Sequence, residues 1–116
     1  MNAEDIGRLL QGYRFSTSSE AVLQQAIERV LVEHGVAHER EVRLAVGDRI
    51  DFLIDGVGIE CKIDGTLPAL IRQVERYTLH GRIGEILVVT SRLRLARLPR
   101  ELHGKRIHTL AVGAFL

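Results

Sequence analysis

The sequence predicts an α/β domain: a helix, three antiparallel strands, a second helix and a further strand, with the strands in one mixed central sheet. Three observations predict this fold. Residues 20–34 repeat apolar side chains at helical spacing, residues 41–63 alternate apolar and polar side chains, and residues 85–90 are almost wholly apolar. A chain of 116 residues is expected to form one domain, 1–116, with residues 1–18 as an N-terminal extension.

Two helices are expected before the first strand. Residues 3–11 are a short amphipathic segment, and a longer one follows the Ser/Thr-rich stretch 16–19. Thr17 and Glu20 match a capping box, in which the acid three positions after the cap bonds back to the backbone. Glu20 also lies at the edge of the buried face, where it can contribute to a functional site. The two roles are compatible.

The next segment predicts an antiparallel hairpin. A first strand is expected over 41–46, with a turn at Gly47-Asp48, and Asp55-Gly56 is a strong type I′ turn signal between the next two strands. With this loop, the numbers of paired residues sum to 111, so Asp51 is predicted opposite Glu60. Alternation along the strands gives one apolar face and one charged face. The apolar face contains Ile50, Phe52, Ile54, Val57, Ile59 and Cys61, and the charged face contains Arg49, Asp51, Glu60 and Lys62.

The facing acids Asp51 and Glu60 indicate a cation site. Two carboxylates whose Cβ atoms lie about 5 Å apart repel each other unless a cation lies between them. That geometry favours a bound metal ion. The alternative is that Arg49 and Lys62 neutralise the two acids across the strand pair, as on many solvated sheet faces.

The remaining elements follow from turn and capping signals. The third strand is expected to end near Ile63, and Thr66 is the predicted N-cap of a helix with Pro68 in its first turn. Residues 85–90 are predicted to form a central strand covered on both faces. A last strand is predicted over 106–112.

The pattern Asp51, a short spacer, then Glu60-x-Lys62 resembles the motif of the PD-(D/E)XK nuclease superfamily. The resemblance implies that Asp51 and Glu60 bind a divalent metal and that Lys62 contacts the attacking water or the phosphate. It also implies metal ligation by the Cys61 carbonyl oxygen and by Glu20 near the start of the first core helix. Ile50 stands where the family name has proline, at a position that varies in the family.

A second motif lies on the helix after the hairpin. Gln73 and Tyr77 form a Gln-x-x-x-Tyr pair that resembles the helical motif of RecB-type nuclease domains. A spacing of four places both residues on one side of the helix, next to its packed face. The resemblance, which spans residues 19–90, implies that they border the active site. The alternative is that Tyr77 packs at the core edge and Gln73 is a solvated neighbour.

The expected function is therefore divalent-metal-dependent hydrolysis of DNA, with Mg²⁺ or Mn²⁺ as cofactor. The resemblance is to a RecB-type or Holliday-junction-resolvase-like small nuclease, with Asp51, Glu60, Lys62, Gln73 and Tyr77 as catalytic residues. We expect recognition of DNA structure rather than sequence, because no sequence-reading module is apparent. A homodimer is expected. The alternatives are a non-catalytic nucleic-acid- or partner-binding module, or an accessory subunit of a larger nuclease.

Composition bounds the compartment and the possible cofactors. The net charge is +1, and a single cysteine excludes an internal disulfide. Cys61 is expected to be a packed, inert thiol, and no Cys/His cluster has zinc-site spacing. No membrane span or signal segment is apparent, so we expect no membrane association and a cytoplasmic location. The arginines from Arg92 to Arg100 either follow phosphates or form a solvated face.

Overall fold

The computed structural model describes residues 1–113, which form an α/β domain with three α-helices and a mixed six-stranded sheet. The elements are α1 (Ala3–Gln11), α2 (Glu20–Glu33), β1 (Glu39–Ala45), β2 (Asp48–Ile54), β3 (Val57–Cys61), α3 (Leu67–Thr78), β4 (Glu85–Thr90), the 3₁₀ helix η1 (Leu93–Ala96), β5 (Glu101–Leu102) and β6 (Lys105–Ala111). This order confirms the predicted α/β class and the mixed sheet.

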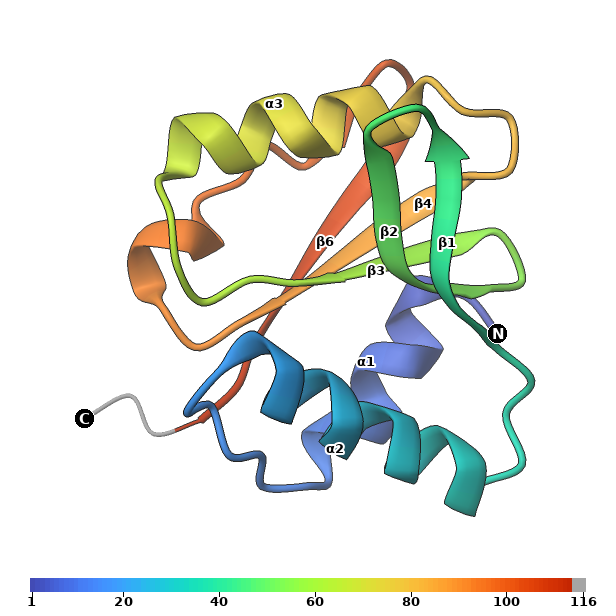
Figure 1. Cartoon of the computed structure of the whole chain (residues 1–116), viewed down its shortest axis with the longest axis vertical. Helices are drawn as coiled ribbons and strands as arrows, with labels where there is room; N and C mark the ends of the chain where they lie inside the picture. The colour runs from blue at the N-terminus through green and yellow to red at the C-terminus, as the bar shows by residue number, and fades with distance from the viewer. Residues whose placement is uncertain (114–116) are drawn as a thin grey trace.

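The strands lie in the order β1-β2-β3-β4-β6-β5. Strands β1 to β3 form an antiparallel meander, whereas β3, β4 and β6 run parallel. Helices α1 and α2 cover one face of the sheet, and α3 with η1 covers the other (Figure 1). The central strand β4 is therefore buried on both sides, as its apolar run predicts.

Each face of the sheet has its own buried core. The α2-side core includes Ile6 and Leu10 of α1, Leu23, Ile27 and Leu31 of α2, and Phe52, Ile59, Cys61, Leu87 and Val89 of the sheet. The α3-side core includes Leu70, Val74 and Tyr77 of α3 and Val42, Ile50, Leu53, Ile86 and Val88 of the sheet. The α1 residues are as buried as those of α2, so the N-terminal segment is part of the packed domain.

The start of α2 differs from the prediction. Its N-cap is Ser19, whose hydroxyl accepts a hydrogen bond from the Val22 N–H at 3.1 Å. The capping box predicted for Thr17 and Glu20 is wrong, because extended backbone at Ser19 puts the cap directly before Glu20. The Glu20 carboxylate is thereby left to bond elsewhere. A capping box that we did not predict, Asn2 with Asp5, begins α1.

The hairpin between β2 and β3 has the predicted register. Phe52 pairs with Ile59 and Ile54 with Val57, and both turn residues have positive φ, 47° at Asp55 and 79° at Gly56. The β1–β2 turn instead falls on Val46-Gly47, one residue before the predicted turn. Val46, predicted as the last residue of the strand, lies in this turn and is 97% exposed.

The predicted facing of Ile50 is also wrong. Ile50 lies in the α3-side core, whereas Phe52, two residues later, lies in the α2-side core, so alternation breaks at Asp51. The register places Glu41 opposite this break, and its φ of 49° is left-handed. Beyond this point the β1–β2 hairpin curls over toward α3 (Figure 1). The bend turns Ile50 onto Gly58, where an added Cβ would lie 2.4 Å from Ile50 Cδ1.

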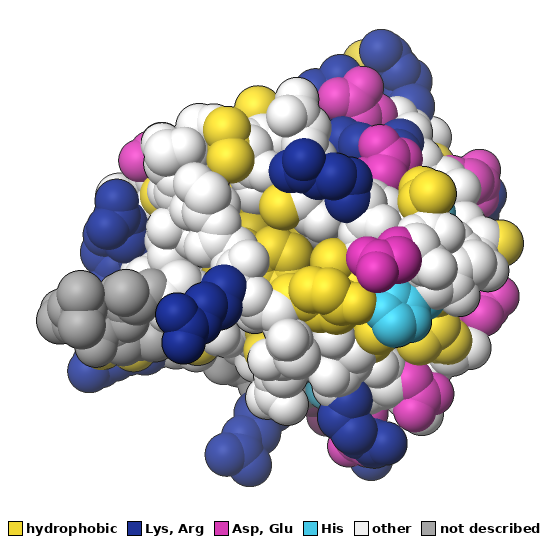
Figure 2. Space-filling view, turned by 90° about the horizontal axis from the view of Figure 1, so that it is seen from below, with side chains coloured by type: hydrophobic (Ala, Val, Ile, Leu, Met, Phe, Trp, Pro, Cys, Tyr) yellow, Lys and Arg dark blue, Asp and Glu magenta, His cyan; other side chains and the backbone are white. Residues whose placement is uncertain are grey.

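The second half of the chain contains the predicted helix and two strands, but β3 ends at Cys61, two residues before its predicted end, and η1 and β5 were not predicted. Thr66 caps α3 by accepting from the Ala69 N–H, and Pro68 lies in the first turn. Strand β4 has the predicted bounds, and β6 begins and ends one residue earlier than predicted. No helix within residues 1–113 is long and apolar enough to cross a membrane. Seen from the α1–α2 side, the surface is mixed, with an apolar patch bordered by charged side chains (Figure 2).

Candidate functional site

The residues singled out by the sequence motifs gather at the carboxyl end of β3. Ile59 and Cys61 point into the α2-side core, so alternation directs Glu60 toward α3. Beyond Cys61 the chain remains hydrogen-bonded to β4, because the Lys62 N–H donates to the Val89 carbonyl oxygen at 2.9 Å. The N-terminus of α2 approaches this strand end through Glu20. The site is thus built from β2, β3, α2 and α3.

Asp51 crosses from β2 to the backbone of β3. Its Oδ2 accepts a hydrogen bond from the Cys61 N–H at 2.8 Å. The β2–β3 backbone ladder ends at Phe52 and Ile59, and this side-chain hydrogen bond links the two strands beyond that point. Burial and the charge of Glu20 raise the pKa of Asp51 to about 6, although the Cys61 N–H bond acts in the opposite direction.

Glu60 is the most deeply buried acid of the site, with only 5% of its surface exposed. Burial and the charge of Asp51 raise the pKa of Glu60 well above its usual range. The positive charge of Lys62 and a hydrogen bond with Tyr77 oppose this shift. Asp51 and Glu60 are therefore close enough to repel each other.

Gln73 and Tyr77 do lie on one side of α3, next to the site. The Gln73 Nε2 donates to the Tyr77 hydroxyl at 2.8 Å. That hydroxyl donates to the Arg49 carbonyl oxygen at 2.9 Å, and Glu60 Oε1 lies 3.3 Å away as an alternative acceptor. Tyr77 is 1% exposed, so its ring packs in the α3-side core while its hydroxyl reaches the site. Burial and the Glu60 charge raise the pKa of Tyr77, which keeps the phenol protonated.

Glu20 braces the chain just after β3. Its Oε1 accepts from the Ile63 N–H at 3.0 Å and from the Asp64 N–H at 3.4 Å. This brace holds the two residues that directly follow Lys62. The Glu20 charge also raises the pKa of Asp51 and of Glu60. The sequence motif indicated Glu20 as part of the site, but gave no signal for this backbone contact.

The expected metal ligands have the right donor atoms for Mg²⁺ or Mn²⁺, but their side chains are not grouped around a single point. Carboxylate and carbonyl oxygens are the donors preferred by Mg²⁺ and Mn²⁺. However, no group of three His, Cys, Asp or Glu side chains within residues 1–113 is arranged to hold a metal ion. Asp51 and Glu20 each use one carboxylate oxygen on backbone N–H groups. The Cys61 thiol is buried with a raised pKa, as expected of an inert side chain, so only its carbonyl oxygen is a candidate ligand.

Arg94 and His80 lie near the site but make different contacts. Arg94, from η1, donates through Nη2 to the Gly65 carbonyl oxygen at 3.2 Å, in the turn between Lys62 and α3. Sequence spacing did not indicate that it reaches this turn. His80, which continues the side of α3 bearing Gln73 and Tyr77, lies 3.5 Å from Asp48 instead of joining the site.

Comparison of the chain with protein-family models, with curated proteins and with solved structures finds no match.

Proposed function

We propose that this protein is a divalent-metal-dependent deoxyribonuclease that cleaves phosphodiester bonds with the motif Asp51, Glu60 and Lys62. The observation that carries the proposal is the pair of acids at the end of β3. Both have raised pKa values, and they share the site with one lysine. Acids kept at such a cost to the folded state are typical of functional sites.

The pair of acids is better suited to a bound metal ion than to a positively charged side chain of the protein. No salt bridge within residues 1–113 joins Lys62 to Asp51 or Glu60, although its charge favours ionised Glu60. We assign Asp51, Glu60 and the Cys61 carbonyl oxygen as ligands of Mg²⁺ or Mn²⁺, with Glu20 acting through water. When bound, such an ion polarises a phosphate and lowers the pKa of a water molecule.

The other side chains have separate tasks in this proposal. Lys62 stabilises the negative charge that grows on the phosphate as the water attacks. The Tyr77 hydroxyl, oriented by Gln73, holds Glu60 in position. Glu20 fixes the 63–64 backbone, so that Lys62 is presented from a rigid strand end.

A cleavage assay tests the proposal directly. The purified chain is incubated with Mn²⁺, Mg²⁺ or EDTA on linear duplex, circular single-stranded, flapped and four-way DNA. Metal-dependent cleavage in the wild type and its loss in Lys62→Ala support the proposal. Cleavage of equal rate in both proteins would identify a contaminating nuclease.

The alternative is a DNA- or partner-binding module on the same scaffold, or an accessory subunit. One observation favours it, namely that no preassembled group of three metal-binding side chains is present within residues 1–113. Saturable DNA binding without cleavage in any metal would support the binding module. Cleavage that appears only with an added partner would support the accessory subunit.

A further inference from the structure

One edge of the sheet is left open along most of β6. The neighbouring strand β5 is only two residues long and pairs with Lys105 and Arg106 alone. Within residues 1–113 no strand pairs with the outer edge of β6 from residue 108 to 111. An unprotected strand edge presents backbone groups that another extended chain can pair with.

The phase of the strand shows which backbone groups face outward. The Ile107 N–H donates outward to the Arg100 carbonyl oxygen, and the Val112 N–H donates inward to Thr90 on β4. Because direction alternates along a strand, the N–H and C=O groups of Thr109 and Ala111 point outward. Both residues are exposed and have small side chains. They offer two donors and two acceptors to an added strand.

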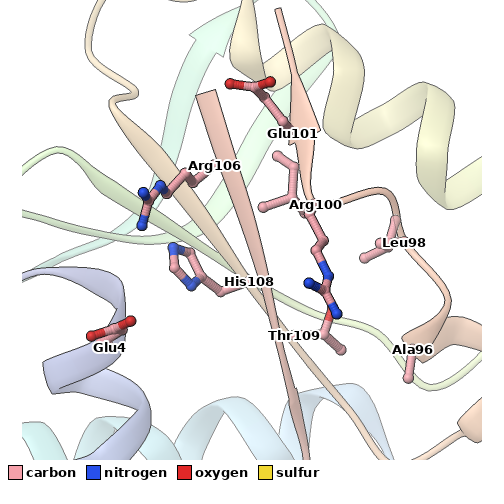
Figure 3. Close-up of a pocket in the computed structure, with 9 residues that line it drawn as sticks. Glu4, Ala96, Leu98, Arg100, Glu101, Arg106, His108 and Thr109 are labelled. Carbon is pink, nitrogen blue, oxygen red and sulfur yellow. The ribbon is translucent and has the colours of Figure 1, made fainter. Parts of the chain in front are cut away.

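Three neighbouring hollows lie along this edge, and we refer to them together as the groove. A cavity of about 640 Å³ surrounds residues 106–109 between α1 and the segment after η1 (Figure 3). A second hollow shares Glu4, His108 and Thr109 with it, and this second hollow shares Gln11 with a third that reaches Val112. Between them, the hollows are lined by every residue of β6 from Arg106 to Ala111.

The groove has a basic rim. Arg100 and Arg106 lie at one end and Arg14 at the other, all exposed. In Figure 3, Arg106 and His108 project to one side of β6 and Arg100 to the other. No salt bridge within residues 1–113 involves these three arginines. Of the acids that line it, Glu4 is paired with Arg8, and Glu101 faces Arg106 across the ladder without a bridge.

We propose that the open edge of β6 is a docking site for an extended acidic segment of a partner protein, which adds as a strand beside Thr109 and Ala111. In this mode of recognition, main-chain hydrogen bonds provide the affinity and contacts of alternate side chains provide the specificity. The acidic side chains of the segment would meet Arg100, Arg106 and Arg14. A second copy of this chain is disfavoured, because antiparallel pairing of two β6 edges would bring one basic rim against the other.

The docking site is separate from the proposed active site. Strand β4 lies between β6 and β3, which carries Glu60, so the two sites are about two strand spacings apart, near 10 Å. Peptide binding and DNA cleavage can therefore fail independently of each other.

The test uses a fluorescein-labelled peptide of alternating valine and glutamate, titrated with the full chain by fluorescence anisotropy. Thr109→Pro removes one outward N–H, and proline is tolerated at strand edges whose N–H faces solvent. We expect Thr109→Pro to lower the affinity for the peptide at least about tenfold, whereas Thr109→Val, which keeps the N–H, leaves the affinity unchanged. Amide chemical shifts of Thr109 and Ala111 should move on titration.

Charge controls complete the experiment. Arg106→Glu is expected to lower the affinity for the peptide about tenfold or more. Two control variants, Arg29→Glu on the exposed side of α2 and Lys62→Ala, should leave the affinity unchanged. A matched valine–lysine peptide should not bind. No saturable binding up to about 1 mM would overturn the proposal. So would binding that Thr109→Pro leaves intact, or a dimer in sedimentation equilibrium that Thr109→Pro dissociates, which would place a second copy on the edge.

Discussion

Two groups of acids in this protein respond to folding in opposite directions. Glu28 of α2 accepts hydrogen bonds from His38 at 2.8 Å and from Arg40 at 2.6 Å, and these partners hold the pKa of Glu28 below its usual range. Asp51 and Glu60, in contrast, have raised pKa values, because burial and the negative charges of neighbouring acids (Glu20 for Asp51, and Asp51 with Glu20 for Glu60) outweigh the nearby positive charge.

The difference separates an internal ion network from a candidate binding site. Glu28 is already matched by cations of the chain, with the Arg40 guanidinium also 4.6 Å over the Phe52 ring. The acids at the end of β3 have backbone and phenol hydrogen bonds but no salt bridge within residues 1–113. Of these two places, an added cation would relieve uncompensated negative charge only at Asp51 and Glu60.

The largest effect is expected on cleavage from Lys62. Lys62→Ala should reduce the cleavage rate by a factor on the order of 10²–10³, because one electrostatic group can supply about 3–4 kcal/mol to a transition state. Lys105, the other lysine of the chain, is the matched control, since it bonds to the His80 carbonyl oxygen and not to the site acids. Equal losses in Lys62→Ala and Lys105→Ala would remove Lys62 from the chemistry.

Metal binding should distinguish the two groups of acids. Asp51→Ala is expected to weaken Mn²⁺ binding by more than about tenfold, and Glu28→Gln to leave it unchanged. Isothermal titration calorimetry on folded samples at pH 8 measures both. The same Mn²⁺ affinity in wild type and Asp51→Ala would contradict the metal site.

Stability should depend on pH with opposite sign at the two groups. The folded pKa of Asp51, about 6, exceeds its usual 3.8, so the folded protein binds more protons between these values. Its contribution to the free energy of unfolding therefore falls as pH rises from about 4 to 6 and stays low above that window. Asp51→Asn keeps an oxygen acceptor for the Cys61 N–H and should stabilise the metal-free protein at pH 8 by about 1–3 kcal/mol.

Glu28→Gln is the opposite case. Its lowered pKa means that the ionised acid stabilises the folded state above the usual value of 4.5, and that this contribution is lost as pH falls. We expect Glu28→Gln to destabilise at pH 8 and to be nearly neutral at low pH. Urea unfolding of both variants at several pH values measures the signs. The same sign in both would refute the contrast.

The smallest effect is expected at Gln73. Gln73→Ala should lower cleavage a few-fold while changing the free energy of unfolding by less than about 1 kcal/mol, because it removes one partly buried side-chain hydrogen bond. Arg72→Ala, exposed on the same helix, is the control. Tyr77→Ala should instead destabilise the fold by about 3–5 kcal/mol through its lost buried ring. Unchanged specific activity in Gln73→Ala would remove the residue from the site.

Local sequence signals determined the β2–β3 hairpin register, the start of α3 and the central strand. Asp55-Gly56 placed the β2–β3 loop, because few other residue pairs adopt positive φ at both positions without strain. Thr66 and Pro68 marked the start of α3, and the apolar run 85–90 marked the central strand. These signals act over a few residues, so they are legible in the chain itself.

Only the tertiary structure decided how the site residues meet. The left-handed Glu41 and the bend of the β1–β2 hairpin turned Ile50 to the other core, against simple alternation. Glu20 bonds to the Ile63 N–H across 43 residues of chain, in place of the local cap that spacing favoured. Burial, which raises the pKa values of Asp51 and Glu60, likewise depends on packing between elements far apart in sequence. Contacts between such distant residues exist only in the folded chain, so no short stretch of sequence predicts them.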